Sequence, residues 1–121
     1  KNNGMHRTYK SKHCGNYITV PSTNSLGIFD TTFIKMDVEG SELAVLEILF
    51  DILDQNEPTL IMEFHPPSIE EKGDNPKEIY ELLSDFYNHI SLIPNIKEHF
   101  TYEDLYLHTD DQSGGRNILC R

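Results

Sequence analysis

The stretch from residue 32 to residue 42 constrains the fold more than any other part of the sequence. It begins as a nearly continuous apolar run, interrupted by Lys35, and it ends in Asp37, Glu39 and Gly40. Such runs are typical of strands in parallel sheets that are covered on both faces. Gly40 permits a sharp turn, or a close approach of another group to the backbone. The stretch therefore predicts a buried strand that turns into a helix.

The residues that follow this strand predict a helix up to about Asp54. Ser41 is a good N-cap residue, and Glu42 favours the positive end of a helix dipole. Glu47, Asp51 and Asp54 form a narrow polar stripe at helical spacing, and apolar residues fill the rest of the segment. We therefore expect this helix to be mostly buried, with Glu42 as a helix-dipole residue.

A second apolar strand is predicted at 59–65, and together with the strand at 32–38 it has the spacing of a right-handed βαβ crossover. The segment 68–75 is polar, so we expect a mobile loop. Asn75 and the proline after it indicate the start of another helix. The inward face of that helix is predicted to be Ile79, Leu82, Leu83 and Phe86.

The remaining segments complete an α/β pattern. Strands are predicted at 17–20, near 89–93 and near 116–120, with a short helix from Thr101 to about His108. We expect residues 1–16 to form a polar arm or loop and residues 17–121 to form one partial domain.

Composition excludes several classes of function. The net charge of −10 repels nucleic-acid backbones and anionic membranes, so we expect no partner of either kind. No apolar run approaches the ~18 residues of a membrane span, and the first residues do not show the basic-then-apolar pattern of a signal peptide. Cys14 and Cys120 form no disulfide framework, and the spacing of His6, His13 and Cys14 matches no zinc pattern. We therefore expect a cytoplasmic protein with reduced thiols and no recognisable metal motif.

Polar residues stand at the carboxyl ends of the two predicted parallel strands. Asp37 and Glu39 end the first strand, and Glu63 and His65 end the second. Ligands of open α/β sheets bind outside these strand ends, so the four side chains are expected to converge on one site. Lys35 shares a strand face with Asp37 and could pair with it. Clustered carboxylates can bind a hard cation, act as a general base toward a hydroxyl, or hydrogen-bond a polyol.

At these residues the sequence resembles the FkbM-type methyltransferases, a branch of the class I S-adenosylmethionine-dependent fold. The family's hallmark resembles an apolar strand running into Lys-x-Asp-x-Glu-Gly-x-Glu, which is matched from Lys35 to Glu42. The family's next strand typically ends in Glu-x-His after a proline, which is matched by Pro58, Glu63 and His65. The resemblance covers roughly residues 17–120.

The resemblance implies a Rossmann-like α/β fold of which this chain is the C-terminal half, with parallel strands and a final antiparallel pair. No Gly-rich turn after a strand precedes Phe33, so we expect the N-terminal, cofactor-binding half of the domain to be absent. The strand at Phe33 would then lie at a sheet edge. We expect a longer native protein, or another chain, to cover that edge.

The resemblance also implies an activity. We expect methyl transfer from S-adenosylmethionine to a hydroxyl of a small molecule or saccharide, with a divalent metal as an optional further cofactor. The catalytic residues would be Asp37, Glu39 and His65, with Asp37 favoured on the acceptor side or as the base. Glu63, Lys35 and Gly40 would bind the substrate. We expect this chain to be inactive on its own.

Two other classes of function remain open at this point. One is a metal-dependent hydrolase or sugar-nucleotide transferase that uses the cluster of Asp37, Glu39, Glu63 and His65. The other is a non-catalytic fragment or interaction module, which the missing Gly-rich turn would favour.

Overall fold

The structure is a computed structural model that describes residues 30–109 and 116–121. The predicted arm at 1–16, the predicted strand at 17–20 and Cys14 lie outside the described residues. The elements in chain order are β1 (Phe33–Met36), α1 (Glu42–Asn56), β2 (Thr59–Phe64), α2 (Pro66–Lys72), α3 (Pro76–Phe86), β3 (Ile90–Leu92), α4 (Tyr102–Thr109) and β4 (Arg116–Cys120).

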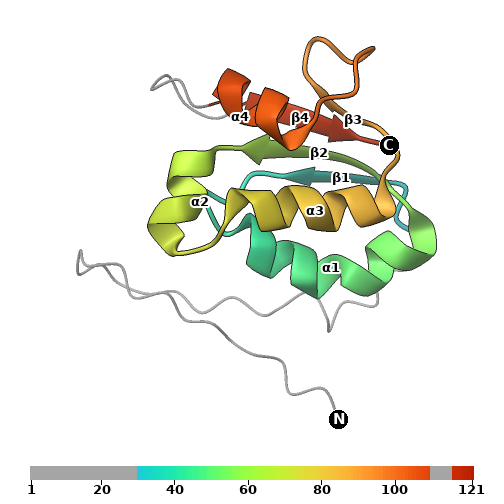
Figure 1. Cartoon of the computed structure of the whole chain (residues 1–121). Helices are drawn as coiled ribbons and strands as arrows, with labels where there is room; N and C mark the ends of the chain where they lie inside the picture. The colour runs from blue at the N-terminus through green and yellow to red at the C-terminus, as the bar shows by residue number, and fades with distance from the viewer. Residues whose placement is uncertain (1–29, 110–115) are drawn as a thin grey trace.

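The described strands form one mixed sheet in the order β1-β2-β4-β3 (Figure 1). β1 and β2 are parallel, with Met36 opposite Met62, and α1 is the crossover between them. β4 runs antiparallel to both β2 and β3. The predicted parallel pair and the predicted antiparallel pair at the end of the chain are therefore both confirmed.

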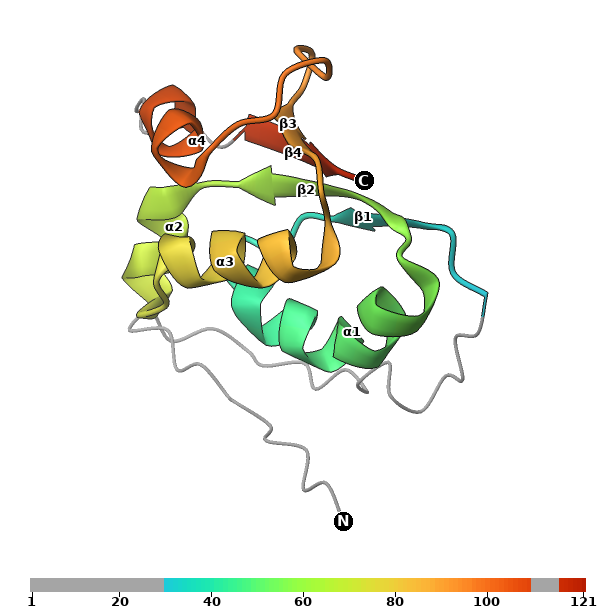
Figure 2. The ribbon, with the colours of Figure 1, turned by 45° about the vertical axis from the view of Figure 1, so that its right-hand side comes forward.

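The hydrophobic core lies between one face of the sheet and the helices, and Figures 1 and 2 show α1 and α3 along that side. β2 alternates strictly, because Leu60, Met62 and Phe64 are fully buried whereas the residues between them are only half-buried. On β1, Phe33 and Lys35 are exposed. The expectation of a sheet covered on both faces is therefore not met within residues 30–109 and 116–121.

Helix α1 corrects one prediction. It spans the predicted residues, but only Glu42, Leu46 and Leu53 are buried. Ile48 and Phe50 are 40% and 47% exposed, so the helix is not mostly buried. The sequence shows which residues of a helix are apolar, but whether they are buried depends on the elements that pack against the helix. Among the described elements, α1 contacts α3, where Phe50 meets the ring of Phe86 edge-on at 5.1 Å between centroids.

The predicted loop at 68–75 is also wrong in part, because α2 occupies Pro66–Lys72. The two prolines at its start have their φ angles preset for a helix and lack N–H groups that the first turn would leave unpaired. Ile69 is fully buried in the core, which anchors the helix. Gly73 ends it in a left-handed conformation, with its N–H donating to the carbonyl oxygen of Glu70.

The predicted starts of α3 and α4 are confirmed. The Asn75 side chain accepts a hydrogen bond from the N–H of Lys77 at 3.0 Å, with a proline in the first turn. At α4, the Thr101 hydroxyl accepts from the N–H of Asp104 at 3.2 Å. In return the carboxylate of Asp104 accepts from the N–H of Thr101, also at 3.2 Å. This reciprocal pair is a capping box.

Strand β1 forms one edge of the described sheet, as predicted. Phe33 at its start is 54% exposed. Cys120 in β4 is a buried free thiol, and burial raises its pKa to about 12. None of the described helices is long and apolar enough to cross a membrane.

Candidate functional site at the carboxyl edge of the sheet

The turn after β1 has a backbone that few residues adopt. Glu39 and Gly40 both have positive φ angles, of 52° and 87°. The left-handed region is open to glycine but costs a non-glycine residue free energy, on the order of 1 kcal/mol or more. Glu39 is therefore held in a strained conformation at the point where the candidate site was predicted.

Gly40 has a structural reason to be glycine. A Cβ atom at this position would collide with the backbone carbonyl of Ser68, which belongs to α2. The predicted close approach at Gly40 is thus filled by another part of the same chain. It joins the turn after β1 to the first turns of α2.

Glu42 has a different environment from the one that its sequence position suggested. It lies in the first turn of α1, but it is 2% exposed. One carboxylate oxygen accepts a hydrogen bond from the N–H of Gly40 at 3.1 Å, and the other is buried without a hydrogen-bond partner among the described residues. Burial raises the pKa of Glu42, and the nearby charges of Glu39 and Asp37 act in the same direction. Ser41 occupies the N-cap position as predicted, but its side chain makes no capping hydrogen bond.

Three of the predicted residues converge. Asp37, Glu39 and Glu63 each offer a carboxylate oxygen, and these oxygens all lie within 4.8 Å of one another. The pairing of Met36 with Met62 explains this, because it places the residues after β1 beside the end of β2. We call Asp37, Glu39 and Glu63 the acidic trio.

Lys35 pairs with Asp37 as predicted. Its Nζ lies 3.6 Å from the Asp37 carboxylate, and both side chains are about half exposed. An exposed ion pair of this kind contributes little to stability.

The pKa of Glu63 is raised by its surroundings. Partial burial raises its pKa, and the charges of Asp37 and Glu39 and a side-chain hydrogen bond with Asp37 raise it further. His65 acts in the opposite direction. Asp37 and Glu63 are neighbouring carboxyl groups, and their like charges disfavour ionisation of Glu63.

His65 does not join the clustered carboxylates of the acidic trio, although its charge acts on Glu63. It is the N-cap residue of α2, and its Nδ1 lies 2.6 Å from the Ser68 hydroxyl oxygen. The structure therefore brings together three of the four predicted polar groups, and the ring of His65 contacts α2 instead.

The sequence did not point to Asn117. It is an exposed residue of β4 and pairs with Glu63 across the strands. Only the β2–β4 register places it there, and no local pattern in the sequence carries that information. Asn117 adds an amide to the row of polar groups at this edge.

The acidic trio supports two kinds of chemistry. Carboxylate oxygens at these separations can hold a hard divalent cation. A carboxylate whose pKa is raised can instead act as a general base toward a hydroxyl. Both uses suit a site at the carboxyl ends of neighbouring parallel strands.

The described residues form an α/β domain with an acidic cluster at the carboxyl ends of its parallel strands, which is where the ligands of open α/β sheets bind. A model of the methyltransferase FkbM domain matches residues 6–90, which is more than half of the 121 residues. The chain therefore belongs to the FkbM methyltransferase domain family. Searches of curated proteins and of solved structures gave no significant match.

Family membership supports a methyltransferase-type enzyme. It confirms the resemblance seen in the sequence. It does not favour the hydrolase, the sugar-nucleotide transferase or the interaction module as alternatives.

Proposed function

We propose that this protein transfers a methyl group from S-adenosylmethionine to a hydroxyl group of a small molecule or saccharide. The observation that carries the proposal is the acidic trio, which lies at the carboxyl edge of the β1–β2 pair in a chain of the FkbM family. A deprotonating group at that edge is what an acceptor hydroxyl needs.

The charge of the site suits the cofactor. The three carboxyl groups of the acidic trio, and the buried oxygen of Glu42 that has no hydrogen-bond partner among the described residues, concentrate acidic groups at this edge. S-adenosylmethionine carries positive charge on its sulfonium and amino groups, and when bound it supplies an electrophilic methyl group. Asp37 and Glu39 are the described residues that would stabilise those charges.

The Asp37–Glu63 pair is proposed as the general base. The pair would accept the proton of the acceptor hydroxyl on a carboxylate oxygen as the acceptor oxygen forms its bond to the methyl carbon. The raised pKa of Glu63 makes its carboxylate a stronger base than an ordinary glutamate. Lys35 would hold Asp37 in position, and His65 would maintain the entry into α2 through Ser68.

The test is a transfer assay with S-adenosylmethionine labelled on its methyl group and a pool of saccharide and small-alcohol acceptors. It uses a form of the protein that begins further upstream in the reading frame, because we expect this chain to be inactive on its own. Asp37→Asn and Glu63→Gln should each lower the rate at least about 100-fold, the usual contribution of a general base. Glu47→Gln removes the same charge from an exposed position of α1 and should leave the rate unchanged. Transfer at the parent rate by both site variants would overturn the proposed role of the pair.

A further inference from the structure

A second site lies away from the acidic trio. A cavity of about 520 Å³ is lined by Glu70, Tyr102, Glu103, Tyr106 and Leu107. Glu70 belongs to α2 and the other four belong to α4, so the cavity lies between these two helices. No residue of the acidic trio lines it.

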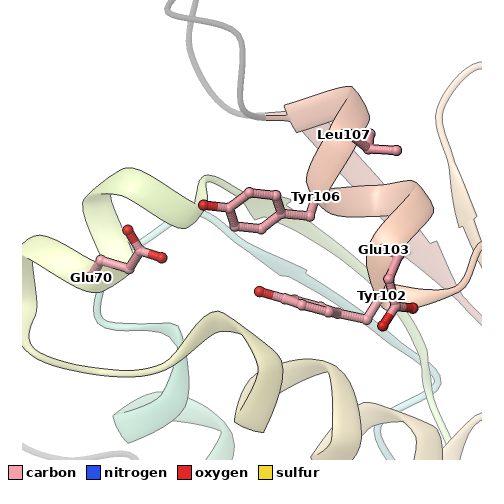
Figure 3. Close-up of a pocket in the computed structure, with 5 residues that line it drawn as sticks. All are labelled: Glu70, Tyr102, Glu103, Tyr106 and Leu107. Carbon is pink, nitrogen blue, oxygen red and sulfur yellow. The ribbon is translucent and has the colours of Figure 1, made fainter.

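The two tyrosines form one aromatic wall. Tyr102 and Tyr106 are separated by one helical turn, and their ring centroids lie 5.8 Å apart at an angle of 53°. Both are half-buried. Figure 3 shows both hydroxyl groups directed toward the side of the cavity where Glu70 lies. The ring of Tyr102 also contacts the ring of Tyr80 on α3, with 6.0 Å between the centroids.

The other lining groups are carboxylates and one alkyl side chain. Glu70 and Glu103 supply two negative charges, and none of the lining residues is a lysine, arginine or histidine. Leu107 is 78% exposed and supplies an apolar rim. Burial raises the pKa of Tyr102, and Tyr106, Glu70 and Glu103 raise it further, so the tyrosine stays a neutral phenol.

Two aromatic rings, two carboxylates and a leucine side chain together suit a cation with an apolar surface. Aromatic faces attract cations through their quadrupole, and carboxylates add direct charge attraction. A small metal ion would gain little from tyrosine rings or from a leucine rim, whereas an alkylated ammonium group can use all three kinds of contact. The net charge of −10 also attracts cations to the surface.

We propose that the cavity between α2 and α4 binds an organic ammonium group through the rings of Tyr102 and Tyr106 and the carboxylate of Glu70. The proposal does not depend on methyl transfer, because it rests on residues that the acidic trio does not include.

Nuclear magnetic resonance titration of the chain with choline tests the proposal. Choline should shift the amide signals of Glu70 and Tyr106 in a saturable manner. Dimethylbutanol has the same shape with carbon in place of the charged nitrogen, and it should bind at least about fivefold more weakly, the ratio that corresponds to a cation–π contribution of about 1 kcal/mol. Equal affinity for the two probes, or no saturable shift with choline, would overturn the proposal.

Variants separate the contributions of charge and ring. Glu70→Gln and Tyr106→Leu should each weaken choline binding about fivefold or more, while Glu47→Gln on α1 should leave it unchanged. Glu70 is exposed, so Glu70→Gln should fold normally and it provides the decisive comparison if the tyrosine variant does not fold. Unchanged affinity in Glu70→Gln would contradict the assigned site.

Discussion

At the scale of single residues, Glu63 joins the strand pattern to the candidate chemistry. Its neighbours in β2 point into the core, while Glu63 points to the other face and meets the carboxylates that follow β1. Its pKa is raised first by burial and then by Asp37 and Glu39. The folded chain therefore holds a proton on Glu63 more tightly than the unfolded chain does.

The pH dependence of stability follows from this direction. Because the pKa of Glu63 is raised above 4.5 in the folded chain, the protonated Glu63 side chain favours folding. This contribution to the free energy of unfolding is fully present below pH 4.5 and is lost as the pH rises through the folded-state pKa. Glu63→Gln removes this loss, so the variant should be more stable than the parent at neutral pH and gain less, or nothing, below pH 4.5. Urea unfolding at both pH values provides the measurement. A stability difference that does not change with pH would contradict the raised pKa.

Gly40 and Gly73, the two glycines in the described part of the chain, both have positive φ angles and allow a matched comparison. Gly40→Ala places a methyl group against the Ser68 backbone as well as straining φ, whereas Gly73→Ala strains φ but meets no atom within 4 Å. Gly40→Ala should cost about 2 to 4 kcal/mol of unfolding free energy and Gly73→Ala about 1 kcal/mol. Equal losses in chemical denaturation would show that the contact with α2 is unimportant.

At the scale of elements, most helices and strands could be predicted because caps and apolar runs lie within the element that they mark. Asn75 with the following proline marked the start of α3, and apolar runs marked β1 and β2. Helix α2 was not predicted, because two consecutive prolines also suit the end of a strand and the segment 68–75 is polar. The same prolines, with Gly73 at the other end, are compatible with a short helix, and the burial of Ile69 selects that outcome.

The two predicted N-cap residues, Asn75 and Ser41, differ in the structure. Asn75 makes its capping hydrogen bond, but the Ser41 side chain makes none. Asn75→Ala should therefore lower the unfolding free energy by about 1 kcal/mol, and Ser41→Ala should change it by less than about 0.5 kcal/mol. Thermal unfolding of both variants makes the comparison. A larger loss in Ser41→Ala would contradict the observed capping.

At the scale of the whole molecule, the site residues could be predicted only where the pairing of the strands could be predicted. The strand ends marked Asp37, Glu39 and Glu63, and the parallel register brought them together. The position of Asn117 depends on a long-range antiparallel pairing, and the burial of Glu42 depends on how α1 enters the core. Neither property is encoded in local spacing.

The exposed start of β1 carries a prediction about self-association. Phe33 is 54% exposed at the edge of the described sheet, and apolar edge strands are templates for pairing between chains. Phe33→Lys should slow concentration-dependent aggregation measured by light scattering. Ile96→Lys changes an exposed residue outside the strands, and it should have a smaller effect. Equal slowing by both variants would indicate a general effect of charge.

The most direct test of the central claim is calorimetric titration of S-adenosylmethionine into this chain and into a form that begins further upstream in the reading frame. The account predicts saturable binding by the form that begins upstream, weakened by Asp37→Asn and unchanged by Glu47→Gln. Absence of binding in both forms, with circular dichroism showing both folded, would contradict the assignment of S-adenosylmethionine as the cofactor.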